Sequence, residues 1–138
     1  MMTNNRRFVF DTNVLISAFL FSQSKPRQAL DQAQDIGIIL LSNSVLSELE
    51  EVLYRPKFDR YLTKERRQEF IENLTETSQL IDVTEQINEC RDIKDNKYLE
   101  LALSGQAECI VTGDDDLLVL NPWRDIEILN VQEFLASK

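Results

Sequence analysis

Histidine is absent from this chain of 138 residues. Its absence excludes every mechanism built on an imidazole base, including the serine and cysteine schemes that depend on histidine. Only two cysteines are present, Cys90 and Cys109, and their spacing matches no zinc or redox motif. They predict free thiols in a reducing compartment. Chemistry in this chain must therefore come from carboxylates, Lys, Ser, Thr, Tyr or Cys.

Long apolar runs and flexible linkers are also lacking. The longest apolar run, Val14 to Phe21, is interrupted by Ser17 and is too short to cross a bilayer, which takes about 20 residues. The segment from Met1 to Arg7 is polar and has no hydrophobic region typical of a signal peptide. Hydrophobic residues still make up 43% of the chain, enough for a core. We therefore expect one cytoplasmic domain over residues 1–138, with no membrane association.

The net charge of -9 at first argues against a nucleic-acid partner. The charges are unevenly distributed, however. Residues 1–70 carry 10 basic and 9 acidic side chains, whereas residues 71–138 carry 5 basic and 15 acidic ones. Part of this acidic excess is compatible with a cation site, since each bound divalent ion would cancel two charges.

Short apolar runs alternate with helical patterns along the chain. This alternation predicts an α/β fold, with a central and mostly parallel sheet covered by helices on both faces. Parallel sheets of this kind collect their functional residues beyond the carboxyl ends of the strands. We expect strands at residues 7–10, 38–41, 80–83, 109–112 and 126–129, and helices at 14–21, 26–37, about 45–54, 63–78 and 96–104 and after Asn130.

Acidic residues follow two of the predicted strands directly. Asp11 comes after the first strand, and Asp114 and Asp116 come after the fourth, with Gly113 between. Both groups therefore belong to the edge where a parallel sheet builds its sites. Each also has an ordinary explanation, because Asp11 could simply cap the next helix and the Gly-Asp run could simply form a turn.

Two further acids lie on predicted helices. Asp95 precedes the apolar Leu99 by four residues, so it shares the inner face of its helix and needs a partner there, unless it only caps the helix. Glu48 and Glu50 lie at opposite edges of an apolar stripe. Periodicity alone does not choose between them, and a solvated edge position explains either one.

Carboxylates gathered at one edge repel one another. At 4 Å and an effective dielectric constant near 20, each pair costs about 4 kcal/mol. Such a cluster is stable when some members take up protons or when a cation binds. Mg²⁺ and Mn²⁺ prefer oxygen ligands, and two such ions can clamp a phosphodiester.

Four segments carry these acids in order along the chain. They read FVFDTNVLISA at residues 8–18, SVLSELEEVLYRPKF at 44–58, DIKDNKYLELA at 92–102 and VTGDDDLL at 111–118. Together they resemble the motifs of the PIN-domain nuclease family, in the branch that contains toxins of toxin–antitoxin pairs. The resemblance implies a three-layer PIN-like sandwich that binds Mg²⁺ or Mn²⁺.

The resemblance also implies roles for individual residues. It selects Glu48 over Glu50, makes Asn13 a polar contact near the first acid, and gives Ser44 a supporting role in the second motif. Asp92 stays outside the implied set. The metal-binding and catalytic acids would be Asp11, Glu48, Asp95 and Asp114, with Asp116 as an accessory metal ligand.

The implied activity is an endoribonuclease in which a water activated at the metal attacks the RNA phosphate in line. A small antitoxin and a second copy of the chain are the implied protein partners. Two alternatives are an RNA-processing PIN nuclease without an antitoxin and an inactive PIN module that only binds. A phosphatase of the haloacid-dehalogenase type is disfavoured, because Asn13 stands where that family has its general-acid Asp. The candidate RNA-binding residues, which a solvated helix face would also explain, are Arg55, Lys57, Arg60, Lys64, Arg66 and Arg67.

Overall fold

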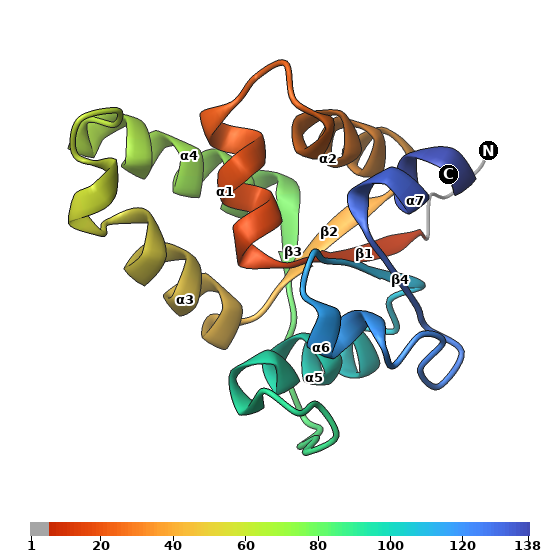
Figure 1. Ribbon diagram of the computed structural model, residues 1–138. Helices are drawn as coiled ribbons and strands as arrows, with labels where there is room; N and C mark the ends of the chain where they lie inside the picture. The colour runs from red at the N-terminus through yellow and green to blue at the C-terminus, as the bar shows by residue number, and fades with distance from the viewer. Residues whose placement is uncertain (1–5) are drawn as a thin grey trace.

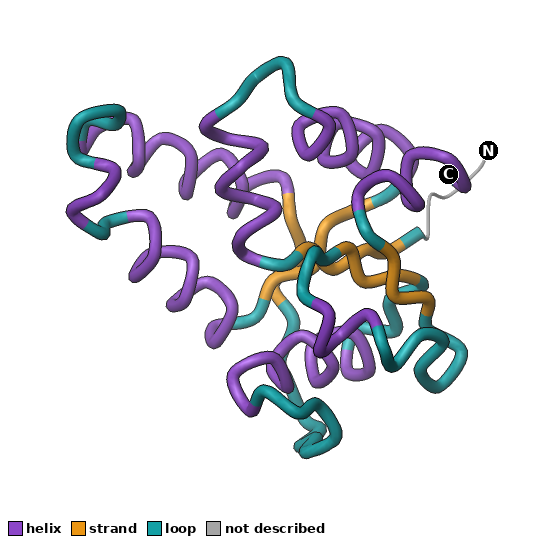
Figure 2. Tube along the Cα trace, viewed as in Figure 1, coloured by secondary structure: helices purple, strands orange, loops and turns teal. Residues whose placement is uncertain are grey.

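The computed structural model describes residues 6–138, and a five-stranded parallel sheet lies at its centre (Figures 1 and 2). The strands lie in the order β3-β2-β1-β4-β5, and every ladder between them is parallel. Most of the polar segment from Met1 to Arg7 lies outside the described residues. The strands are β1 (Arg7–Phe10), β2 (Ile38–Leu41), β3 (Ser78–Leu80), β4 (Cys109–Val111) and β5 (Glu127–Leu129).

Helices cover both faces of this sheet, as Figure 1 shows. The helices α1, α2, α4 and α7 lie on one face, and α5 and α6 lie on the other, so the expected three-layer α/β architecture is confirmed. The helices are α1 (Thr12–Leu20), α2 (Lys25–Ile36), α3 (Asn43–Leu53), α4 (Lys64–Thr77), α5 (Asn96–Ser104), α6 (Asp115–Leu118) and α7 (Val131–Ser137), with short 3₁₀ turns η1 (Pro56–Phe58) and η2 (Ile93–Asp95).

The strand order reverses between β1 and β4. The chain leaves β1 toward β2 on one side, and it later enters β4 on the other side of β1. Crossover connections that diverge from two neighbouring strands leave a crevice beyond their carboxyl ends. The segments that follow β1 and β4 therefore meet at one place, and these segments contain Asp11 and Asp114.

The core and the helix ends follow the sequence pattern closely. The runs Phe8–Phe10 and Ile39–Leu41 are buried, as strands covered on both faces should be. Asn130 and Glu133 form a reciprocal capping box at the start of α7, which begins directly after Asn130 as expected. Phe134 of the same helix packs edge-on against Phe8, with ring centroids 5.5 Å apart.

Two local predictions differ from the structure. The third strand lies at Ser78–Leu80 and not at residues 80–83, because its backbone pairs with Ile39–Leu41 directly after α4 ends. This strand contains a polar Ser and a polar Gln, so it lacks the apolar run that marks the other strands. Residues 115–118, for which no helix was predicted, form the short helix α6 with Asp114 as its N-cap. Among the described residues, no helix is long and apolar enough to cross a membrane.

Candidate metal centre

Asp11 stands where β1 meets α1 and is buried. Its Oδ1 accepts the backbone N–H of Asn13 at 3.0 Å, and its Oδ2 accepts the hydroxyl of Thr112 at 2.7 Å. Burial raises the pKa of the Asp11 carboxyl, and the nearby carboxylates of Glu48 and Asp114 raise that pKa further against the opposing effect of the two hydrogen bonds. Two fixed donors thus hold a carboxylate at the end of the central strand.

Asp114 reaches the same crevice from β4. The hydroxyl oxygen of Thr112, which donates to Asp11, accepts the backbone N–H of Asp114 at 3.0 Å. The Oδ1 of Asp114 in turn accepts the backbone N–H of Asp116 at 2.9 Å, which makes Asp114 the N-cap of α6. One buried threonine therefore couples the acids that follow β1 and β4.

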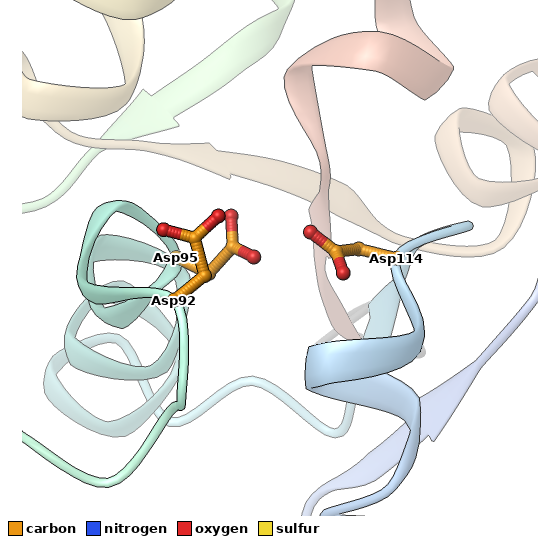
Figure 3. Close-up of side chains that lie close together, drawn as sticks. All are labelled: Asp92, Asp95 and Asp114. Atoms are coloured by element: carbon orange, nitrogen blue, oxygen red, sulfur yellow. The ribbon is translucent and has the colours of Figure 1, made fainter.

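A third and a fourth acid face Asp114 from η2 and from the residue just before it. Carboxylate oxygens of Asp92, Asp95 and Asp114 all lie within 4.8 Å of one another, and Figure 3 shows Asp114 directed toward the other two side chains. Asp95 is 8% exposed, and no hydrogen-bond donor in residues 6–138 reaches its buried Oδ2. A buried carboxylate oxygen without a donor is costly unless a proton or a cation satisfies it.

The close approach of these carboxylates shifts the pKa values of Asp95 and Asp114. Burial raises the pKa of Asp95 to about 8, and the neighbouring Asp114 carboxylate contributes to that rise. The pKa of Asp114 is lowered, because a protonated Asp95 can donate to it. The two carboxylates therefore share one proton when no cation is present. A divalent ion would replace that proton.

Glu48 approaches from α3 and is held by a separate network. Its Oε1 accepts the hydroxyl of Thr12 at 3.1 Å and the phenol of Tyr98, and its Oε2 lies 3.4 Å from the Nζ of Lys97. The Tyr98 oxygen also accepts the backbone N–H of Thr12 at 3.1 Å. Glu48 is partly buried in this network, whereas Glu50 is exposed on the other edge of the helix.

The remaining predicted site residues lie at the margin. Asp116 forms an ion pair with Arg91 at 2.9 Å, so a cation of the chain already neutralises it. Asn13 contributes its backbone N–H to Asp11, while its side chain is exposed. Ser44 is exposed, and the N-cap of α3 is Ser42, whose hydroxyl accepts the N–H of Val45 at 3.1 Å.

The donor set fits a hard divalent cation. The closest trio offers only carboxylate oxygens, which Mg²⁺ and Mn²⁺ prefer, and no histidine exists to bias the site toward softer metals. The buried Oδ2 of Asp95 is an available ligand atom. Asp92, Asp95 and Asp114 could hold the ion, with Asp11 beside them at the end of β1.

Several side chains of this candidate metal centre were not among the predicted site residues. Asp92 was left out of the predicted set, although it precedes Asp95 by three residues. Thr112, Tyr98 and Lys97 were not singled out, because their roles depend on contacts with segments far away in the sequence.

The prediction that Arg67 binds RNA is wrong. Arg67 is 5% exposed, and its guanidinium donates to Asp59 at 3.0 Å and to the carbonyl of Leu62 at 2.9 Å. It fastens the segment before α4 and has no free surface for a phosphate. The other five predicted residues are exposed: Arg55, Lys57, Arg60, Lys64 and Arg66. Arg55 among them is paired with Glu51 at 2.9 Å.

A family model described as PIN domain matches residues 7–116. The chain belongs to the PIN domain family. Proteins of this family are in general nucleases, which supports a hydrolase in broad terms. An uncharacterised protein of Methanocaldococcus jannaschii, MJ1680, is 34% identical over 116 residues, which is 83% of this chain and 74% of that protein.

Solved structures share the PIN fold at low sequence identity. A chain of the structure of VapBC2 from Rickettsia felis, bound to a DNA fragment from their promoter, is similar with a TM-score of 0.61 and 15% identity, and the match covers 90% of this chain and 98% of that one. PAE2754 from Pyrobaculum aerophilum is similar with a TM-score of 0.59 and 13% identity, and the match covers 96% and 88% of the two chains. These similarities confirm the predicted fold class.

Proposed function

We propose that this PIN domain is an Mg²⁺- or Mn²⁺-dependent endoribonuclease. The observation that carries the proposal is the convergence of Asp92, Asp95 and Asp114 within 4.8 Å, together with the buried Asp95 Oδ2 that lacks a donor among the described residues. A site of this kind has little structural purpose without a cation. Its place at the reversal point of the sheet is where open α/β folds bind ligands.

The proposed metal ligands are the carboxylates at the ends of β1 and β4 and in η2. A divalent cation bound there would stabilise the charge on the phosphate and activate the attacking water. The set comprises Asp11, Asp95 and Asp114, extended by Asp92, with Glu48 and Asp116 at its margins.

Other side chains keep this set in position. Thr112 orients Asp11 and the backbone of Asp114 at once. Tyr98 and Thr12 hold one oxygen of Glu48, and its other oxygen lies beside Lys97. Outer hydrogen bonds of this kind fix the direction of ligand lone pairs.

RNA is the proposed substrate, and the exposed cations before and at the start of α4 are its proposed phosphate contacts. These are Lys57, Arg60, Lys64 and Arg66, with Arg55 beside them. A free hydroxyl nucleophile or a histidine is not needed for hydrolysis at such a site, which fits a chain without histidine.

The biological role that we propose is that of a cytoplasmic toxin paired with a small antitoxin, acting as a homodimer. The motif resemblance supports it, and so does the structural similarity to a chain of the VapBC2 complex. Two alternatives are an RNA-processing nuclease without an antitoxin and an inactive module that binds RNA. A gene for a short partner beside this one would favour the toxin, and its absence would favour RNA processing.

The test is cleavage of a mixed single-stranded RNA pool by purified protein with Mn²⁺, with EDTA, and with the variants Asp11→Asn and Asp95→Asn. We expect cutting that needs the metal and is lost in both variants. Circular dichroism would check that the variants fold. Cutting that survives both substitutions would contradict the proposed site, and the absence of cutting by folded, metal-loaded protein would favour the binding module.

A further inference from the structure

A hollow lies beyond the end of α1, the helix that follows Asp11, and beside the segment that follows α3, the helix that carries Glu48. It has a volume of about 590 Å³ and is lined by the rings of Phe19, Phe21, Phe58 and Tyr61 together with Lys57 and Arg66. We call Phe21, Phe58 and Tyr61, with these two cations, the aromatic patch. No acid lines this hollow. It is distinct from the metal centre, whose residues are not among those lining it.

Two rings of the aromatic patch are unusually open to solvent. Phe21 is 60% exposed and Tyr61 is 68% exposed. Phe19, by contrast, is stacked on Phe70 with centroids 4.3 Å apart. Within residues 6–138 no other aromatic ring lies against Phe21 or Tyr61. Large exposed aromatics grouped beside a hollow are typical of a binding surface.

The charge around the aromatic patch is opposite to that of the chain as a whole. The chain carries -9, yet residues 54–67 contain six basic and two acidic side chains, a net charge of +4. One of the basic residues, Arg67, is buried and paired with Asp59, so the solvent faces mainly cations. A polyanion with flat, apolar groups would complement both the charge and the rings.

The geometry of two helices links this surface to the metal centre. Helix α1 begins directly after Asp11 and ends at Leu20, next to Phe21. Its nine residues span about 14 Å at 1.5 Å per residue. Helix α3 also begins at the carboxyl edge of the sheet, carries Glu48, and leads to Lys57 and Phe58. Figure 1 shows both helices running away from this edge of the sheet, and the end of α1 lines the hollow together with residues of η1 and the start of α4.

We propose that the aromatic patch is a base-stacking subsite that holds unpaired nucleotides of the RNA a short distance from the cutting point. Phe21 and Tyr61 stack on bases, and Lys57 and Arg66 contact the adjoining phosphates. Only a strand with free bases can use both features, so the subsite makes the enzyme selective for single-stranded RNA. This inference rests on the proposed function, since it names how the substrate of that site is held.

The test compares binding of three RNAs of equal length to the full chain: a single strand, the same strand without bases, and a duplex. The Asp95→Asn background in Mg²⁺ buffer prevents cutting, and fluorescence anisotropy gives the dissociation constants. We expect Phe21→Ala and Tyr61→Ala each to weaken binding of the single strand about tenfold and to leave binding of the baseless strand unchanged. Lys57→Gln and Arg66→Gln should weaken both strands equally and reduce the salt dependence.

Matched controls keep the result interpretable. Val119→Ala removes an apolar side chain that is 76% exposed and lies outside the aromatic patch, so it should change nothing. Phe21→Tyr and Tyr61→Phe keep the rings and should bind the single strand like the parent. Unchanged melting temperatures would show that the alanine variants fold.

The outcomes separate this inference from the nuclease proposal. If the wild-type chain cuts RNA but the alanine variants bind all three RNAs like the parent, the stacking subsite is wrong and the nuclease stands. If those variants instead lose self-association, measured by light scattering, the aromatic patch is a protein interface and the inference is overturned. If the wild-type chain neither cuts nor binds RNA, the proposed function is wrong, and the stacking subsite is wrong with it.

Discussion

Carboxylates lie at both ends of the central strands β1 and β4, but their partners differ between the two ends. At the amino ends of β1 and β4, Glu108 is bound by the guanidinium of Arg6 at 3.0 and 3.1 Å and by Lys138 at 3.1 Å. At the carboxyl ends, Asp11 and Asp114 lie among further acids, and within residues 6–138 the nearby Arg91 is ion-paired with Asp116 and with neither of them. One end neutralises its carboxylate within the chain, and the other leaves its carboxylates to be neutralised from solution.

The pKa of Glu108 shifts in the opposite direction to the pKa values of the buried Asp11 and Asp95. The hydrogen bond from Arg6 leads the effects that lower the pKa of Glu108, whereas burial raises the pKa of Asp95 to about 8. A carboxylate paired with cations, such as Glu108, stabilises the fold. A buried carboxylate among other acids, such as Asp95, destabilises the fold until a ligand binds. The comparison therefore marks which acids are structural and which are functional.

The largest contrast should appear in catalysis. Asp95→Asn removes a proposed metal ligand and should lower RNA cleavage with Mn²⁺ by about 100-fold or more, because even the loss of outer partners of metal ligands typically costs 10- to 100-fold. Glu108→Gln should leave the cleavage rate within about twofold, since it touches only the amino end. Single-turnover kinetics would measure both. Equal losses in the two variants would contradict the division between the ends.

Metal binding should stabilise one end only. With Mn²⁺ at 100 times its dissociation constant, the free energy of unfolding should rise by about 2.7 kcal/mol in the wild-type chain and in Glu108→Gln. In Asp95→Asn, where we expect binding to be about tenfold or more weaker, the gain should fall to about 1.4 kcal/mol or less at the same Mn²⁺ concentration. Thermal unfolding with and without Mn²⁺ would measure the gain, and an undiminished gain in Asp95→Asn would place the ion elsewhere.

A smaller effect is expected from the hydroxyl that holds Glu48. Tyr98→Phe deletes the donor to Glu48 and the acceptor of the Thr12 N–H, both in a buried setting. We expect a roughly tenfold loss of cleavage and a loss of about 1–3 kcal/mol in stability. Thr12→Val, which keeps the backbone N–H, is the matched control and should cost less in stability. Cleavage at the wild-type rate in Tyr98→Phe would show that Glu48 needs no orientation.

The smallest effect is a pair of opposite pH dependences in metal-free protein. The folded-state pKa of Asp95 is raised from 3.8 to about 8, so the folded state holds the extra proton and stability falls as pH rises through that interval. The folded-state pKa of Glu108 is lowered from 4.5, so its contribution is present above that value and is lost as pH falls through the lowered pKa. Because the lowered pKa of Asp114 offsets much of the raised pKa of Asp95, and Glu108 is partly exposed, each effect should amount to a few degrees in melting temperature.

Denaturation across pH would separate these two slopes. Asp95→Asn should remove the decline on the neutral side, and Glu108→Gln should remove part of the decline on the acid side. A neutral-side decline that is unchanged in Asp95→Asn would assign it to another group, with Asp11 as the first choice because its pKa is also raised.

Much of the metal centre was predictable because strand ends are readable from apolar runs. Asp11 and Asp114 follow buried runs directly, and Asp95 shares the face of Leu99, so local pattern places all three. Glu48 and Glu50 were equivalent by periodicity. The contacts that distinguish them come from Thr12 and Tyr98, which are 36 and 50 residues away.

The features that the sequence did not predict depend on tertiary contacts. Arg67 looked like one more solvated cation of a basic helix, but the turn before α4 directs it inward onto Asp59. The strand at Ser78–Leu80 exists because β2 offers it a free edge, and its own residues carry no apolar run. Asp92 has no helical periodicity to give its direction, because it lies just before the short turn η2.

We propose that the carboxyl ends of β1 and β4 take up a divalent cation that no cation of the described chain replaces. The most direct test is a titration of purified protein with Mn²⁺, followed by electron paramagnetic resonance of the free ion. We expect saturable binding by the wild-type chain and by Glu108→Gln, weakened by about tenfold or more in Asp95→Asn. The same affinity in all three proteins, or no binding to the wild-type chain, would contradict it.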